Sequence, residues 1–341
     1  MSELEALREN VQDLRRALRL LEGRGISTAD YGSAGNGMRD YSETSFETYD
    51  ARADSERARE VAATDSPFHI EVRFLGGLTP SQKQVFKDAA DRWAKLIVGD
   101  LPDTIVAGEI IDDVRIDAQG VPIDGVGGIL GQAGPQLVRP QGAGKHAFLP
   151  VTGIMQFDTA DLASMENRGV LNDVITHEMG HVLGCNAFVW ERKGFVIGKE
   201  TENWAFTGPM ATAEYGQLID PCSRQDAADG HAKPVPIENL HGPGTRGSHW
   251  RETVFGNELM TGFVGQAGNP LSRITGGMFG DIGYDVDLAA CDPYQLPSHL
   301  QLAELGLLAP AARDYEELGV VLPTIPLVAS DESMDLSRLR R

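Results

Sequence analysis

Apolar side chains recur near the start of the chain at alternating intervals of three and four residues. This heptad spacing predicts an amphipathic helix over residues 1–22. The helix either lies on the body of the protein or joins two copies of the chain into a homo-oligomer through residues 4–21. The apolar positions are Leu4, Leu7, Val11, Leu14, Leu18 and Leu21. Residues 23–66 contain few aliphatic side chains and many small or charged ones, so we expect a flexible linker there.

From residue 67 onward the pattern becomes that of a folded domain. Apolar and polar side chains alternate from Phe68 to Phe74, as in a half-buried strand, and Thr79 precedes a stretch whose apolar positions share one helical face. The predicted elements are strands at 68–74, 104–116 and 152–157, helices from residue 80 and at 171–183, and a glycine-rich, loop-rich stretch with short strands at 125–135. This mixture predicts an α+β fold.

The same pattern divides the chain into segments. Residues 67–184 are expected to form an N-terminal catalytic subdomain that ends in the helix at 171–183. Residues 185–294 are rich in glycine and proline with few periodic runs, which indicates an irregular C-terminal subdomain. Residues 295–341 are expected to be a tail, to which we assign no chemistry.

The predicted helix at 171–183 carries the sequence His177-Glu178-Met179-Gly180-His181. Histidines four residues apart project from one face of a helix, so His177 and His181 can bind one Zn²⁺ ion together. Glu178 then borders the open side of the metal, where it can take a proton from zinc-bound water and pass it to a leaving amine. An accidental match is the alternative, but burying these three side chains without a ligand would be unfavourable.

A catalytic zinc usually has three protein ligands, so one is still missing. Gly184 can end the helix and turn the chain back toward the metal, but the position where a third histidine would then follow is Ala187. The best candidate is His249, because Met260 follows it by eleven positions and can form an apolar floor beneath the metal. The other candidates are His241 and the carboxylates Glu200 and Glu202.

The net charge of the chain bears on which kinds of molecule it binds. The chain of 341 residues carries a formal charge of −20, which argues against nucleic acid or an anionic membrane surface as its main partner. Its sequence contains no apolar run of transmembrane length. The N-terminus lacks the basic and apolar regions of a secretion signal, so a cytoplasmic location or export by a leaderless route is expected.

Two further groups of residues bear on metal and redox chemistry. Three cysteines do not support a disulfide framework, although a single Cys222–Cys291 bridge stays open; the third is Cys185. A structural Ca²⁺ ion near Asp112, Asp113 and Asp124 is no more than a guess, because clustered aspartates usually lie in solvated turns.

The helix motif, the long interval of 65 positions from Gly184 to His249, and the segment from Gly242 to Gly262 resemble the leishmanolysin family of metzincin zinc metallopeptidases. The resemblance extends from about Phe68 to Tyr294. No cysteine precedes Cys185, so the propeptide cysteine latency of parasite members is absent, and the chain looks like a bacterial-type relative.

The resemblance implies a set of roles and a fold. His177, His181 and His249 would bind one catalytic Zn²⁺, Glu178 would be the general base, and Met260 would be the Met-turn residue. A twisted mixed β-sheet and the active-site helix would lie above the zinc cleft, with the irregular C-terminal subdomain below. The substrate would be an extended polypeptide, cut as by an endopeptidase. It would pair with an edge strand, for which the candidate residues are Thr152, Gly153, Ile154 and Met155.

Two other functions stay open at this point. The first is a zinc hydrolase of another class, either a carboxylate-ligated peptidase or an amidase. The second is a non-catalytic, zinc-stabilised interaction protein that acts through its N-terminal helix. Glu178 argues against the second, because a structural zinc site needs no base and is usually closed by a fourth protein ligand.

Overall fold

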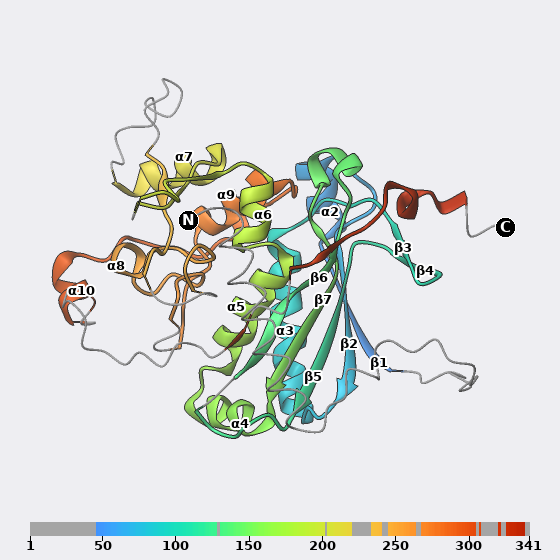
Figure 1. The fold of residues 1–341 in the computed structure, drawn as a ribbon, viewed down its shortest axis with the longest axis horizontal. Helices are drawn as coiled ribbons and strands as arrows, with labels where there is room; N and C mark the ends of the chain where they lie inside the picture. Colours follow the sequence, from blue (N-terminus) through green and yellow to red (C-terminus); the bar gives the residue numbers. More distant parts are fainter. Residues whose placement is uncertain are drawn as a thin grey trace. The chain divides into compact units, whose positions relative to one another are not determined.

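The largest element of the fold in the described part of the computed structural model is a mixed β-sheet (Figure 1). The structure describes residues 46–341 except 128–129, 202, 220–232, 241–244, 264–266, 305–306, 308–319, 322–324 and 338–341. The predicted helix at 1–22 and the first part of the predicted linker lie outside the described residues. In the described part of the chain, the strands of this sheet follow the order β1 (Glu47–Arg52), β2 (His69–Gly76), β5 (Val114–Val121), β7 (Pro150–Asp158), β6 (Gly131–Val138) and β11 (Val320–Val321), and β12 (Leu327–Val328) also pairs with β6.

Strand directions in this sheet are mixed. β2, β5 and β7 run parallel to one another, whereas β1 is antiparallel to β2 and β6 is antiparallel to β7. The two short C-terminal strands β11 and β12 run parallel to β6 on its outer edge. Together with the helices, this twisted mixed sheet confirms the expected α+β class.

Two long helices cover the sheet. α3 (Pro80–Leu96) begins at a capping box formed by Thr79 and Gln82, and α5 (Leu171–Leu183) packs against both α3 and the strands β6 and β7. The helices meet the sheet in an aromatic core in which the Phe86 ring contacts those of Phe74 and Phe157 edge-on. This aromatic packing fixes α3 against the sheet, and α5, which packs on α3 and on the sheet, carries the candidate site.

The predicted substrate edge strand is wrong, because residues 152–155 lie inside the sheet. Within β7, Thr152 pairs with Arg115 of β5 on one side and with Leu137 of β6 on the other. The sequence indicated only short strands within a loop-rich stretch here, since the glycines and Pro135 have low strand propensity. Tertiary pairing with β7 overrides that propensity, and β6 forms a full strand between β7 and the short strands β11 and β12.

The predicted linker at 23–66 does not extend to residue 66 in the structure. Residues 46–66 belong to the folded body, where β1 pairs along its length with β2. Ala51 within β1 and Ala53 directly after it are buried, and the Tyr49 hydroxyl donates to Asp91 of α3. The low aliphatic content that predicted a linker therefore reflects close packing of alanines.

The C-terminal half contains short elements around the site. α7 (Pro209–Ile219) packs on α9 (Arg273–Ile282), and a small antiparallel sheet has the order β10 (Val235–Pro236), β9 (Ala205–Phe206), β8 (Val196–Ile197). The remaining elements are α2 (Ser55–Arg57), η2 (Ala58–Ala62), β3 (Thr104–Val106), β4 (Glu109–Ile111), η3 (Gln141–His146), α4 (Thr159–Arg168), α6 (Ala187–Arg192), α8 (Glu252–Phe255), η4 (Leu288–Ala290), α10 (His299–Glu304) and η5 (Asp331–Met334). No described helix combines the length and apolar character needed to cross a membrane.

Candidate metal centre

The first two histidines of the candidate site lie on α5. The helix is apolar on several faces, with Val174, Ile175 and Val182 among its buried residues, so it is held inside the protein. It ends at Gly184, whose φ of 119° is a left-handed conformation that favours glycine. The chain therefore turns directly after His181, and the Cys185 carbonyl comes close to that imidazole.

Three imidazoles converge at one point. The Nε2 atoms of His177 and His181 are 2.9 Å apart, those of His181 and His249 are 2.9 Å apart, and those of His177 and His249 are 3.2 Å apart. These residues come from α5 and from the loop before α8, which are far apart in the sequence. Among the described residues, this group contains the three histidines and no fourth metal-binding side chain.

Each imidazole has a backbone carbonyl behind it. Nδ1 of His177 lies 2.6 Å from the Leu259 carbonyl oxygen, Nδ1 of His181 lies 2.5 Å from that of Cys185, and Nδ1 of His249 lies 2.9 Å from that of Thr245. A carbonyl can only accept, so each Nδ1 carries the proton and each Nε2 presents a lone pair.

Three lone pairs that face one another repel unless a cation lies between them. Zn–N bonds of roughly 2.0–2.1 Å in a tetrahedron separate the nitrogens by about 3.3 Å, close to the distances seen here. The three histidines therefore fit a zinc ion, and the carbonyls behind them fix the required tautomer and ring orientation.

Burial keeps the histidines in the neutral form that binds metal. Desolvation lowers the pKa of His177 to about 4. It also lowers the pKa of His249 to about 3, with a further contribution from His177. The pKa of His181 is well below its ordinary value, again mainly through burial. Neutral imidazole is the ligand form, so these groups need not lose a proton before they bind metal.

Glu178 follows the first histidine and is 2% exposed. Burial raises the pKa of its carboxyl group to about 8. A cation held by the neighbouring histidines would favour the ionised form and lower this pKa again. The position thus holds a buried carboxyl group whose proton affinity depends on whether a cation lies between the histidines.

Met260 lies against α5 from the other half of the chain. A Cβ atom added at Gly180, inside the helix motif, would lie 2.8 Å from Met260 Sδ. The turn that carries Met260 is closed by a hydrogen bond from the Thr261 amide to the Glu258 carbonyl, 3.1 Å. The same turn supplies the Leu259 carbonyl that faces His177. The structure therefore brings the methionine and the three histidines into one region.

Other predicted candidates do not join this group. Glu200 is exposed and is not among the clustered residues, while His241 and Glu202 lie outside the described residues. Cys185 and Cys291 are free thiols, and Cys222 lies outside the described residues.

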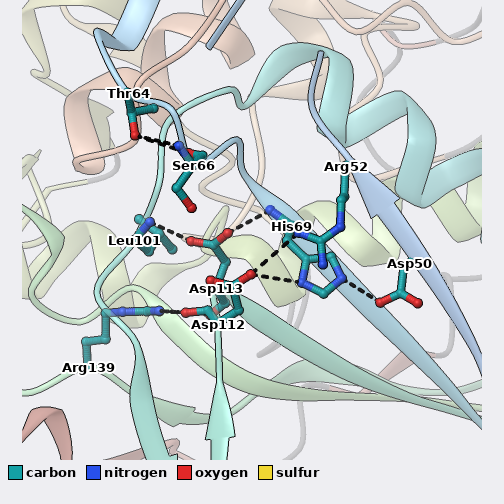
Figure 2. A network of polar contacts seen from close by, with 9 residues as sticks. All are labelled: Asp50, Arg52, Thr64, Ser66, His69, Leu101, Asp112, Asp113 and Arg139. Atoms are coloured by element: carbon teal, nitrogen blue, oxygen red, sulfur yellow. Dashed lines mark hydrogen bonds and ion pairs between the residues drawn. The ribbon is translucent and has the colours of Figure 1, made fainter. Parts of the chain in front are cut away.

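The guess of a Ca²⁺ site is not supported. Asp112 and Asp113 do lie together with Asp100, but Asp124 is not part of that group. Figure 2 shows that protein donors surround these carboxylates. The Asp113 carboxylate accepts from the backbone amides of His69 and Leu101, and Asp112 pairs with the His69 imidazole. The network therefore satisfies the two carboxylates without a cation.

Sequence reasoning missed the three backbone carbonyls that orient the imidazoles. They belong to Cys185, Thr245 and Leu259, whose side-chain types carry no signal for this role. For Cys185, the turn predicted at Gly184 was the one available indication, because it directs the chain back toward the helix.

The region around the candidate site matches a known protein family. The family model of leishmanolysin, a peptidase, matches residues 145–293, which include the three histidines, Glu178 and Met260. A comparison with curated proteins finds no match. The family match confirms the predicted resemblance over residues 145–293, and residues 68–144, which the resemblance was also expected to cover, lie outside the match.

Proposed function

We propose that this chain, leishmanolysin-like over residues 145–293, is a zinc-dependent endopeptidase that hydrolyses internal peptide bonds of polypeptides. The observation that carries the proposal is the convergence of three Nε2 atoms at 2.9–3.2 Å, next to a buried glutamate. His177, His181 and His249 would hold the ion. The absence of a fourth protein ligand among the described residues favours a catalytic site over a structural one.

When bound, zinc supplies Lewis acidity, which polarises the scissile carbonyl group and makes a water molecule more acidic. Glu178 takes a proton from the attacking water and later donates it to the leaving amine, so no covalent intermediate with the protein is needed. Its buried position keeps bulk water from competing for that proton. The carbonyls of Leu259, Cys185 and Thr245 hold the imidazoles in the ligand orientation, and Met260 supports α5 from below.

The two halves of the site support a metzincin arrangement for this fold. His177, Glu178 and His181 belong to the segment 67–184, which contains the sheet and α5. His249 and Met260 belong to the irregular segment 185–294. In this proposal the peptide lies between the two segments, and the zinc site joins them.

An extended peptide would pair with β6, in the place of β11 and β12, and not with β7, which lies inside the sheet. β6 packs on α5, and among the described residues its outer edge is paired at Gly131 and Gln132 by β11 and at Leu137 and Val138 by β12. A peptide that replaced β11 and β12 along this edge would obtain main-chain hydrogen bonds next to the helix that carries Glu178.

The substitution Glu178→Gln tests the mechanism. It keeps the size of the side chain and removes the base, so zinc content and fold should be retained. The rate of peptide hydrolysis should fall by about 10²- to 10⁴-fold. Glu214→Gln is the matched control, because Glu214 is also buried but pairs with Arg273 away from the site. Equal cleavage of a peptide library by wild type and Glu178→Gln would refute the proposal.

The assay panel separates the alternatives. Casein cleavage that a chelator abolishes and zinc restores is expected for an endopeptidase. Hydrolysis of small amides without casein cleavage would indicate an amidase, and zinc binding without any hydrolysis would indicate a structural metal.

A further inference from the structure

The carboxylate of Glu258 is buried beneath the metal centre and accepts four hydrogen bonds. Its Oε2 accepts from the Met260 amide at 2.6 Å. Its Oε1 accepts from the Ser272 amide at 3.1 Å, from the Ser272 hydroxyl at 2.7 Å and from the Thr275 hydroxyl at 2.6 Å. These donors lie in two elements, the turn that carries Met260 and the start of α9, so the carboxylate joins them.

One oxygen of this carboxylate fixes the turn behind His177. The bond from the Met260 amide to Oε2 closes the turn around Leu259, whose carbonyl oxygen faces Nδ1 of His177 at 2.6 Å. On the other side, the Leu259 amide donates to the Pro270 carbonyl at 2.9 Å. The position of the Leu259 carbonyl therefore depends on the Glu258 carboxylate.

The other oxygen reaches the neighbour of His249. The Thr275 hydroxyl donates to Oε1 and accepts from Trp250 Nε1 at 2.8 Å. Trp250 directly follows His249, and its amide donates to the Met260 carbonyl at 2.9 Å. A path of hydrogen bonds thus runs from the carboxylate through Thr275 to the chain segment that carries the third histidine.

We propose that Glu258 is a positioning residue of the metal centre, which holds His177 through the Leu259 carbonyl and His249 through Thr275 and Trp250. The proposal rests on the proposed function, because it assumes that the three histidines bind zinc.

The chemistry of the side chain explains why this position needs a carboxylate. An ionised carboxylate is acceptor-only and can take several donors at once. The amide of glutamine would turn an NH₂ group toward at least one of these donors, and a buried N–H or O–H would then lose its acceptor. We expect the turn to shift, together with the carbonyl that orients His177.

The test compares Glu258→Gln with the control Glu214→Gln in the full chain. Glu214 is buried and bonds Arg273 at the start of α9, but it has no hydrogen bond with the turn among those of the described residues. Zinc affinity is measured by competition with a chelator, and the ligand geometry by the visible spectrum of the Co²⁺-substituted protein. We expect zinc to bind 10- to 100-fold more weakly in Glu258→Gln than in the control, with a changed Co²⁺ spectrum.

A second pair of variants keeps the test valid if Glu258→Gln does not fold. Thr275→Val removes the hydroxyl link at constant shape, whereas Thr275→Ser keeps the hydroxyl. We expect weaker zinc binding and a changed Co²⁺ spectrum in Thr275→Val, and values near those of wild type in Thr275→Ser.

The outcomes separate this inference from the proposed function. If wild type itself binds no zinc, the proposed function fails. If wild type binds zinc, and the folded Glu258→Gln and Thr275→Val variants match their controls in affinity and in spectrum, the positioning role is overturned while the zinc site stands.

Discussion

Gly180 lies inside the helix motif, where its missing side chain leaves room for Met260 and Trp93. A Cβ atom at this position would lie 2.8 Å from Met260 Sδ and 2.9 Å from Trp93 Cζ2. The indole of Trp93 is held in place, because its Nε1 donates to the Thr176 carbonyl at 2.9 Å and its ring packs against Phe279. An alanine at 180 would therefore push mainly on the methionine beneath the metal.

Two opposing terms set the size of the effect of Gly180→Ala on stability. Replacing glycine by alanine in a helix interior stabilises a protein by roughly 1 kcal/mol. Forcing an extra methyl group into a packed core costs about 1–3 kcal/mol. Gly216 in α7 is the matched control, since a Cβ there would meet no atom within 4 Å. We expect Gly216→Ala to stabilise the fold by roughly 1 kcal/mol, and Gly180→Ala to be less stable than that control by about 1–3 kcal/mol.

Chemical denaturation of the two chelator-treated variants measures this difference in the free energy of unfolding. Titration with zinc then measures the second consequence, weaker metal binding in Gly180→Ala and unchanged binding in Gly216→Ala. If Gly180→Ala stabilised the protein as much as Gly216→Ala and kept full zinc affinity, the described packing of Met260 on α5 would be wrong.

Further predictions concern the metal, pH and the C-terminal segment. His249→Ala should lower the zinc content of purified protein, as measured by metal analysis, and unchanged stoichiometry would redirect attention to His241. Burial raises the pKa of Asp113 to about 8. The folded state therefore binds this proton more tightly than the unfolded state, and the contribution of Asp113 to stability falls as pH rises from about 4 to 8. Denaturation at several pH values should show a flatter profile for Asp113→Asn, and an unaltered profile would contradict this assignment. Deleting residues 320–341 should leave the fold intact, because Pro326 is the one buried side chain among residues 325–337. The deletion should also lower KM for extended peptides, because it frees the edge of β6 that β11 and β12 occupy. An unchanged KM in the folded, truncated protein would argue against this edge as the peptide site.

The helix that carries the metal motif could be predicted because its signals are local. Histidines four positions apart, an apolar run around them and the glycine at 184 all act within a few turns of one helix. The alternation at residues 68–74 predicted β2 for the same reason. Where a pattern reflects contacts within one element, the sequence is sufficient.

Predictions failed where small or breaking residues took part in long-range pairing. β6 contains three glycines or prolines at Gly131, Gly134 and Pro135, yet it pairs along β7. β1 buries one alanine, Ala51, and no large aliphatic side chain. In both strands the stabilising partner is a distant segment, so local propensity underestimated the extent of strand, and the prediction of the edge strand was wrong.

By itself, the sequence predicted the type of candidate site in this protein, because His177, Glu178 and His181 are chemically defined and lie on one helix. It also made His249 and Met260 the leading candidates for the other half of the site. The tertiary structure decided the convergence of His249 on the two helical histidines, since that requires the packing of two segments 68 positions apart. It also decided which backbone carbonyls face the imidazoles, and that the Glu258 carboxylate accepts a hydrogen bond from the turn that supplies one of them. Every residue has a carbonyl, so no side-chain pattern identifies the ones that folding brings to the metal.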